Sequence, residues 1–413
     1  MSRRALAQPA VHSVVQPAVP APVQPDLARW RVVAGAFLVL LAGYGAIYSY
    51  AAFAEPIADE FGTGRANLTL VFAISGASCF FVSPLSGPLA DRIGARVPAL
   101  AGMLLVGLGL LVAASARSLL EVHAGYGLLI GLGTGFAYVP AMAGVQARFR
   151  RHRGLASGIA VSGIGVGTAL VPPAAEALLA PGDWRLAFVV LAIVLSGIGL
   201  VGAALLDGAP LQALAVHLRP AEAAPANGYS FVPIWCGLVL VSLPSTLPHA
   251  LLVATARDLG LPRDAALGLL GLLGLGTIAG RFLLAALADA LGRARVFLAC
   301  SAAMAASLGL WALAPGLPGL QAFALLFGAL QGGFVALLPA FAADGFGGRD
   351  LGGLLGRLYT ARGVALLLAP PALALAMDAA GQRAAPLLAA ALVGLVGTAL
   401  LAAARPRPPH ISA

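Results

Sequence analysis

The chain has 413 residues, of which 60% are hydrophobic and only 10% are charged. Soluble domains carry about 25% charged residues, so this composition argues against a soluble enzyme, a disordered protein and a disulfide scaffold. It is typical of a polytopic membrane protein, because about 20 apolar residues span a bilayer as a helix. The net charge is +9, and all 25 basic residues are arginines.

The first 28 residues contain five prolines and no continuous apolar run. We therefore expect a disordered cytoplasmic tail at 1–28 rather than a twin-arginine export signal, although Arg3 and Arg4 lie near its start. Apolar runs begin after Trp30 and predict an all-α protein with twelve transmembrane helices. The expected spans are 31–53, 68–88, 97–115, 122–146, 155–178, 184–206, 230–253, 265–286, 296–314, 318–342, 354–376 and 384–404.

A polar interval at 207–229 separates the first six spans from the last six. It is the longest polar segment after the N-terminal tail, and its length and composition are typical of a linker. We therefore expect an N-terminal six-helix bundle at 29–206, a cytoplasmic linker at 207–229, a C-terminal six-helix bundle at 230–404 and a cytoplasmic tail at 405–413.

The arginines are unevenly distributed between the two sides of the predicted membrane protein. Seventeen lie in the tails, the linker and the loops of one side, and six lie in the loops of the other side. Because cytoplasmic loops are enriched in basic residues, both termini are predicted to be cytoplasmic in a multi-pass protein of the inner (plasma) membrane. Two arginines, Arg281 and Arg362, lie inside predicted spans and belong to neither side.

The two groups of spans repeat in sequence at a fixed offset of 198 residues. Asp91 and Gly94 of LADRIG correspond to Asp289 and Gly292 of LADALG. The same offset relates further pairs: Gly135 and Gly333, Gly158 and Gly356, Pro172 and Pro370, and Arg185 and Arg383. Several separate matches at one offset indicate a duplicated six-helix unit in parallel orientation.

The stretch GPLADRIGAR lies between the second and third spans. It resembles the loop motif of the major facilitator superfamily, and a weaker copy lies between the eighth and ninth spans. The resemblance covers the chain from Trp30 onward and implies an all-α polytopic membrane protein with two pseudo-symmetric six-helix bundles. It also implies a cytoplasmic gate formed by the motif residues Gly87, Asp91, Arg92, Gly94, Asp289, Gly292 and Arg293.

Four longer stretches resemble the oxalate/formate antiporter and monocarboxylate transporter branch of that superfamily: 43–57, 153–167, 280–293 and 339–371. In that branch an arginine of span eight is associated with the substrate carboxylate, and the resemblance implies this role for Arg281. Oxalate/formate-type members also carry a basic residue in span eleven, which maps to Arg362.

The chain also departs from that branch. Animal-type monocarboxylate transporters have an aspartate one turn before the span-eight arginine and a lysine in span one. The corresponding positions here hold Thr277 and Tyr48. This departure favours anion exchange over lactate-type proton symport.

Arg281 and Arg362 are unusual even without the resemblance. Both lie roughly 12–14 Å from the cytoplasmic edge of their spans, at 1.5 Å per residue, where a charged side chain costs about 2.5–3.5 kcal/mol. The repeat offset places Ser83 and Ile164 at the corresponding positions of the first half. A requirement of the fold alone would appear in both halves, so this asymmetry favours an anion-binding role. Guanidinium groups suit that role because they can bind a carboxylate through two parallel hydrogen bonds.

Other polar residues of the spans are weaker candidates. Tyr44 and Tyr48 lie one turn apart on span one and could orient a carboxylate, or could simply pack against other helices. Gln331 and Tyr359 are similar cases. Ser242, Thr246 and His249 share one face of span seven and could line a cavity or bond a neighbouring helix. Glu176, His123 and His249 are expected toward the outer ends of their spans, where the histidines would be poor proton relays.

These features predict a secondary transporter that moves a small carboxylate anion by alternating access, with anion exchange as the mode. A proton-coupled monocarboxylate symporter and a non-transporting anion sensor are the alternatives. We expect no enzymatic activity, no cofactor, no metal and no nucleic-acid partner; the three cysteines are scattered inside apolar runs. The partners are the small organic anion and the lipid bilayer, and the protein is expected to be a monomer.

Overall fold

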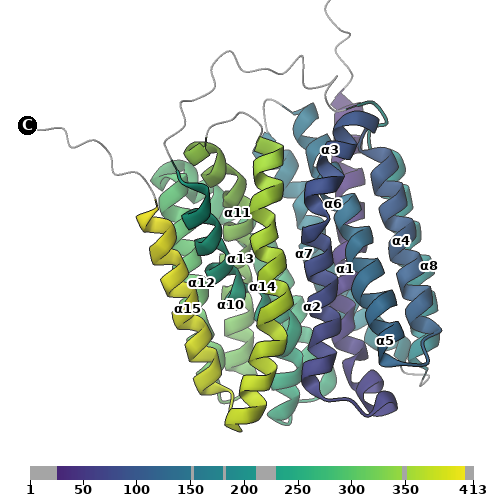
Figure 1. Cartoon of the computed structure of the whole chain (residues 1–413), viewed down its shortest axis with the longest axis vertical. Coiled ribbons are helices and arrows are strands. Elements are labelled where there is room, and N and C mark those ends of the chain that lie inside the picture. Colours follow the sequence, from purple (N-terminus) through teal and green to yellow (C-terminus); the bar gives the residue numbers. More distant parts are fainter. Residues whose placement is uncertain (1–25, 150–152, 180–182, 211–228, 347–350, 405–413) are drawn as a thin grey trace, which may run out of the picture.

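The computed structural model describes residues 26–149, 153–179, 183–210, 229–346 and 351–404. Those residues form helices joined by short turns, and they contain no strand. Figure 1 shows the helices standing side by side in two groups, with α1 to α8 in one and α10 to α15 in the other. The predicted tails and linker lie mostly outside the described residues, although 26–28, expected in the disordered tail, already belong to the first helix.

The first group contains α1 (Asp26–Phe61), α2 (Arg65–Phe81), α3 (Ser83–Ile93), α4 (Arg96–Ala114), α5 (Leu119–Val122), η1 (His123–Leu129), α6 (Ile130–Arg148), α7 (Arg153–Leu179) and α8 (Trp184–Leu205). The second contains α10 (Phe231–Asp258), α11 (Arg263–Leu291), α12 (Arg293–Leu313), α13 (Leu317–Phe346), α14 (Leu351–Ala380) and α15 (Ala384–Ala403).

Within the described residues, eleven helices are long and apolar enough to cross a membrane. The second predicted span is instead two helices, α2 and α3, bent by 42° at Val82. Pro84 causes this bend, because it has no N–H group to continue the hydrogen-bond ladder of α2. Counted as one broken span, the pair completes the twelve predicted spans. The fourth span also differs from a plain α-helix, since it contains the π-helical segment η1.

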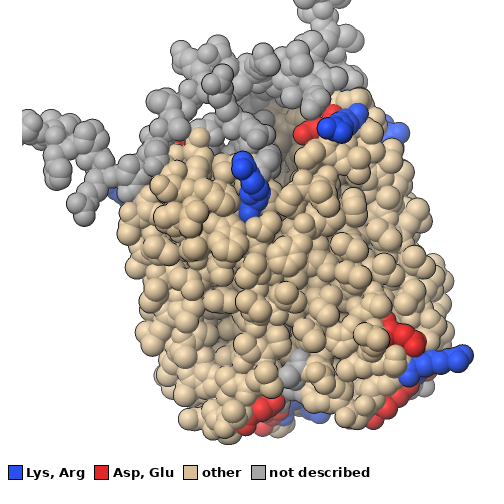
Figure 2. Space-filling model, viewed as in Figure 1, with Lys and Arg blue, Asp and Glu red and all other residues tan. Residues whose placement is uncertain are grey.

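The outer surface of the two groups is apolar along most of the helix length. Figure 2 shows a broad uncharged belt, with charged side chains gathered toward the two ends of the helices. Large apolar side chains such as Leu283, Ile193 and Leu313 are each more than two-thirds exposed. Such exposure is unfavourable in water but natural against lipid tails, so the belt marks the membrane-spanning zone of the protein.

The two halves meet along the helix pairs α2–α14 and α7–α11. Small residues bring these helices close together. A Cβ atom added at Gly274 would lie 2.6 Å from the carbonyl oxygen of Gly165, and one at Gly76 would lie 2.8 Å from the side chain of Leu366. This close approach is typical of membrane helix packing, where small residues let backbones touch.

The repeat in sequence is also a repeat of contacts. Arg185 at the start of α8 donates a 2.8 Å hydrogen bond to the carbonyl of Ala116. Its counterpart Arg383, before α15, donates to the carbonyl of Ala314, and both partners are separated by the same 198 residues. Each half therefore ties the beginning of its last span to the turn after its third span in the same way.

We call the end of the molecule that holds the α3–α4 and α11–α12 turns the arginine-rich end, and the other end the opposite end. At the opposite end, ion pairs join the two halves. Arg257 of α10 lies 3.0 Å from Glu55 of α1, and Arg263 of α11 lies 2.9 Å from Glu176 of α7 and 3.5 Å from Glu55. Glu176 thus lies near the C-terminal end of α7, at the opposite end of the molecule. These contacts bridge the two halves at the opposite end of the interface.

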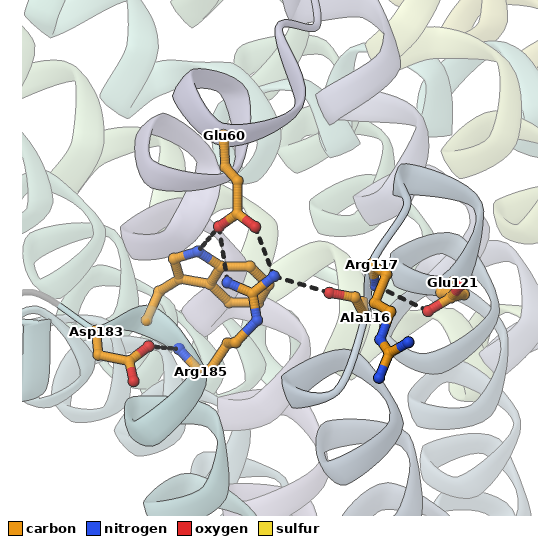
Figure 3. Close-up of polar contacts among 7 residues, drawn as sticks. Glu60, Ala116, Arg117, Glu121, Asp183 and Arg185 are labelled. Atoms are coloured by element: carbon orange, nitrogen blue, oxygen red, sulfur yellow. Dashed lines mark hydrogen bonds and ion pairs between the residues drawn. The ribbon is translucent and has the colours of Figure 1, made fainter.

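A further ion pair at the opposite end lies within one half. Arg185 of α8 binds both carboxylate oxygens of Glu60 on α1, at 2.5 and 2.8 Å, and Trp184 adds a hydrogen bond of 2.7 Å (Figure 3). The ion pair therefore joins α1 to α8 inside the first half and makes no contact between the halves.

The first prediction contrasts these two ion-pair clusters. Arg263→Gln removes two ion pairs between the halves, each worth about 0.2–1 kcal/mol. Ala54→Cys, next to Glu55 and in a background without Cys79, Cys236 and Cys300, provides a thiol at this end of the interface. We expect that thiol to react with a membrane-impermeant reagent about threefold to tenfold faster when Arg263→Gln is also present than when it is absent. Arg185→Gln is the matched control, because its ion pair lies within one half, and it should leave the labelling rate unchanged. Equal labelling rates in both variants would contradict this assignment.

The second prediction concerns the turns after α3 and α11. Gly94 and Gly292 have φ angles of +86° and +94°, where a side chain costs roughly 1–2 kcal/mol. A Cβ atom at Gly94 would also lie 2.6 Å from the backbone of Gly208, whereas one at Gly292 meets nothing within 4 Å. Gly94→Ala should therefore lower the thermal unfolding temperature in detergent more than Gly292→Ala does. Equal losses would mean that the contact with Gly208 carries no cost.

Candidate functional site

A cavity lies between the two halves and is lined by residues of α1, α2, α6, α7, α10, α11, α13 and α14. Its lining residues are Tyr44, Tyr48, Phe80, Tyr138, Ile164, Thr168, His249, Thr277, Arg281, Gln331, Val335, Leu338, Tyr359 and Arg362. All six residues that the sequence nominated for substrate contact are among them. These six side chains come from α1 of the first half and from α11, α13 and α14 of the second half.

Arg281 enters the cavity from α11 and is only 4% exposed. One Nη atom donates a hydrogen bond to the carbonyl oxygen of Val161 on α7, across the interface between the halves. Its Nε atom is buried and has no hydrogen-bond partner. Since a guanidinium has five N–H donors, this side chain keeps free donors for a molecule in the cavity.

Arg362 enters the same cavity from α14. Its guanidinium carbon lies 5.5 Å from the centre of the Phe80 ring on α2, within the range of a cation–π contact. Its Nε atom is also buried without a hydrogen-bond partner. Among the described residues that line the cavity there is no carboxylate, so two positive charges share a confined site without a balancing negative charge.

A cluster of aromatic rings forms the wall beside the arginines. The ring centre of Tyr44 lies 6.0 Å from that of Tyr48 and 5.8 Å from that of Tyr138, and Tyr138 lies 6.2 Å from Tyr359. Tyr138 of α6 was not predicted from the sequence. The signal available for it was weak, because Tyr138 is a single tyrosine in a stretch of mostly small residues, from Gly131 to Ala141.

His249 of α10 lines the cavity, which is one of the two roles that the sequence left open for it, but it lies deeper in its span than expected. His249 was expected near the outer end of its span, but α10 continues to Asp258, nine residues further, or roughly 13 Å along the helix axis. His249 therefore lines the central cavity, where its ring stacks on Tyr48 with centres 4.5 Å apart. Gln331 of α13 fixes this part of α10 through a 2.8 Å hydrogen bond to the carbonyl of Ser245.

The counterparts of the two arginines in the first half have different surroundings. Ile164 lines the same cavity that Arg362 lines. Ser83, the counterpart of Arg281, is 1% exposed and donates a 3.0 Å hydrogen bond to the carbonyl of Cys79. The charge of the cavity therefore comes from one half of the repeat.

The predicted gate motif lies at the arginine-rich end. Arg92 is exposed, Asp91 and Gly87 are half-buried, and Gly94 ends α3. In the second copy, Gly292 separates α11 from α12, and Arg293 lies 3.8 Å from Asp344 of α13. The side chain of Asp289 lies outside the described residues, so its predicted gate contact is not observed.

A buried ion pair that the sequence did not predict lies near the motif. Arg148, at the end of α6, binds both carboxylate oxygens of Asp207 at 2.6 and 2.7 Å. The backbone carbonyl of Asp207 accepts a 3.0 Å hydrogen bond from the N–H group of Arg96. Asp207, the first residue of the predicted linker, is 5% exposed and is bonded to Arg148 and Arg96 of the N-terminal half.

The third prediction concerns the cost of the unbalanced charge. Replacing Arg281 with methionine removes a desolvated cation and keeps an unbranched apolar side chain of similar reach. Because hydrophobic replacements of buried charges stabilise proteins by about 1–4 kcal/mol in favourable cases, Arg281→Met should raise the unfolding temperature of the ligand-free protein in detergent by several degrees. Destabilisation by this substitution would show that the guanidinium has a structural role instead.

Comparison with known proteins agrees with this architecture. The sequence profile of the Major Facilitator Superfamily matches residues 35–233 and 234–413. The chain is 26% identical over 381 residues to monocarboxylate transporter 12-B of Danio rerio, covering 83% of this chain and 80% of that protein. It is 29% identical over 364 residues to monocarboxylate transporter 3 of Rattus norvegicus, covering 85% and 74% of the two proteins. The chain is therefore a membrane transporter of the Major Facilitator Superfamily and not an enzyme, and it is similar over most of its length to proteins named monocarboxylate transporters.

Proposed function

We propose that the protein carries a small carboxylate anion across the membrane by alternating access, with Arg281 and Arg362 as the residues that bind the carboxylate. The observation that carries this proposal is the pair of guanidinium groups in one cavity without a carboxylate among the described lining residues. A bound anion would supply the missing negative charge and accept hydrogen bonds from donors that are otherwise unused.

The substrate class has two further supports. The relatives that match most of the chain are named monocarboxylate transporters, which favours a small organic acid. The tyrosine hydroxyls of the cavity wall can donate hydrogen bonds to a second oxygen of such an anion. The remaining lining is apolar, as at Val335 and Leu338, and suits a short hydrocarbon portion.

We propose anion exchange as the mode of transport. In the empty cavity the two guanidinium groups repel each other, and a low dielectric strengthens that repulsion. When the empty protein reorients, the cavity would have to close at both ends while it holds this unbalanced positive charge. Reorientation with a bound anion avoids this cost, so exchange of one anion for another should be faster than net efflux.

The structure suggests how the two halves contribute to alternating access. The ion pairs of Arg257 and Arg263 with Glu55 and Glu176 join the halves at the opposite end. Opening that end would require these contacts to break. We propose that the predicted gate motif, around Asp91 and Arg92, closes the arginine-rich end in turn.

The fourth prediction tests the substrate site. Proteoliposomes loaded with acetate, pyruvate, lactate, oxalate or succinate should take up the same labelled anion by counterflow. Because a hydrogen bond to a charged group contributes about 1.5–3 kcal/mol, Arg281→Ala and Arg362→Ala should each lower apparent affinity roughly tenfold to 150-fold.

The control for this experiment is Arg357→Ala, which removes an exposed arginine of the same helix as Arg362 and should leave counterflow intact. Unchanged uptake in both cavity variants would disprove the site. Efflux without external anion that is as fast as exchange would disprove the exchange mode while leaving the site in place.

A further inference from the structure

A second cavity adjoins the central one, and the function proposed so far gives it no role. It lies between α1 and α2 of the first half and α10 and α14 of the second half, and we call it the side cavity. Arg362 lines both cavities, so the two spaces meet at this guanidinium group. Six described residues line the side cavity but not the central one: Ile47, Phe72, Gly76, Cys79, Thr246 and Leu366.

The side cavity suits an apolar group better than a second charge. The two polar side chains that line it alone are already engaged. The hydroxyl of Thr246 donates a 3.0 Å hydrogen bond to the carbonyl of Leu243 on its own helix, and the Sγ atom of Cys79 lies 3.8 Å from the hydroxyl oxygen of Tyr44. A carboxylate placed here would lose its hydration without gaining new partners, which is costly. The end of a substrate that enters this space should therefore be a hydrocarbon group.

The sizes of the two cavities limit what each can hold. The central cavity has a volume of about 40 Å³ and the side cavity a volume of about 10 Å³. One water molecule needs about 10–15 Å³ on the same scale. The central cavity therefore has room for a carboxylate and the carbon attached to it, whereas the side cavity has room for one group about the size of a methyl.

Leu366 of α14 limits the extent of the side cavity. Its side chain packs directly on α2, because a Cβ atom added at Gly76 would lie 2.8 Å from a Cδ atom of Leu366. Leu366 also follows Arg362 by four residues, so the two side chains share one face of α14 and start about 6 Å apart along its axis. An anion held by Arg362 therefore has Leu366 beside any group that it extends into the side cavity.

We propose that Leu366 sets the upper limit on the size of the substrate. This inference rests on the proposed function, because Arg281 and Arg362 must hold the carboxylate in the central cavity. The apolar end of the substrate then enters the side cavity, where Leu366 packed on Gly76 leaves room for a methyl group but excludes branched and aromatic groups. Shortening Leu366 extends the side cavity and widens the range of acids that the protein accepts.

The fifth prediction compares acids that differ only in their apolar end. Proteoliposomes should take up labelled pyruvate by counterflow while unlabelled pyruvate, 3-methyl-2-oxobutanoate or phenylpyruvate competes from outside. Because one methylene too many in a hydrophobic pocket changes discrimination by about 10-fold to 200-fold, the wild type should bind the two larger acids at least tenfold more weakly than pyruvate. Leu366→Ala should reduce this ratio for 3-methyl-2-oxobutanoate to less than about threefold. A ratio is the appropriate measure, because a general loss of affinity cancels from it.

Leu368→Ala is the matched control. It makes the same truncation two residues further along α14, at a side chain that is 55% exposed on the outside of the bundle, and it should keep the ratio of the wild type. Leu366→Val removes less of the side chain and should give a ratio between those of the wild type and Leu366→Ala. This smaller truncation decides the test if Leu366→Ala fails to fold.

The outcomes separate the role of Leu366 from the proposed function. Equal competition by all three acids in the wild type, or a ratio that the Leu366 variants leave unchanged, would overturn the size limit while the anion site stands. Counterflow of oxalate or succinate without counterflow of pyruvate would do the same. Absence of counterflow for every anion tested, or competition that Arg362→Ala leaves unchanged, would overturn the proposed function and this inference with it.

Discussion

The central physical constraint in this protein is that two arginine side chains line one cavity between the halves, with buried Nε atoms and without a carboxylate among the described residues that line it. Each such charge costs about 2.5–3.5 kcal/mol to place in a membrane helix. The surrounding structure lowers that cost only in part, through the carbonyl of Val161 for Arg281 and the ring of Phe80 for Arg362. The remaining demand for negative charge is the physical basis of the anion site that we propose.

The duplicated architecture explains how such a site can be held in place. Contacts that stabilise each bundle occur in both halves, as with Arg185 on the carbonyl of Ala116 and Arg383 on that of Ala314. The charges of the cavity occur in one half only, since Ile164 occupies the position that corresponds to Arg362. The repeated contacts therefore maintain the two bundles, and departures from the repeat provide the chemistry between them.

The distribution of ion pairs between and within the halves is consistent with a protein that changes conformation. Contacts within a half, such as Glu60 with Arg185, survive a rigid movement of the two bundles. Contacts between the halves, such as Arg263 with Glu176, involve partly exposed side chains, and ion pairs of this kind are individually weak. The alternating access that we propose would need only the ion pairs between the halves to break, while the apolar packing inside each bundle is kept.

The sequence by itself determined the twelve spans, the duplication and the two arginines inside spans. The length of an apolar run and the position of a charge within it follow directly from the order of residues along the chain. It also predicted six residues that line the cavity. Only the tertiary structure decided which faces of the helices meet, because helices that are apolar all round have no polar face to orient them. Tyr138 was missed for this reason. His249 was misplaced because α10 continues beyond the expected end of its span, and the depth of a residue depends on where its helix ends within the bundle.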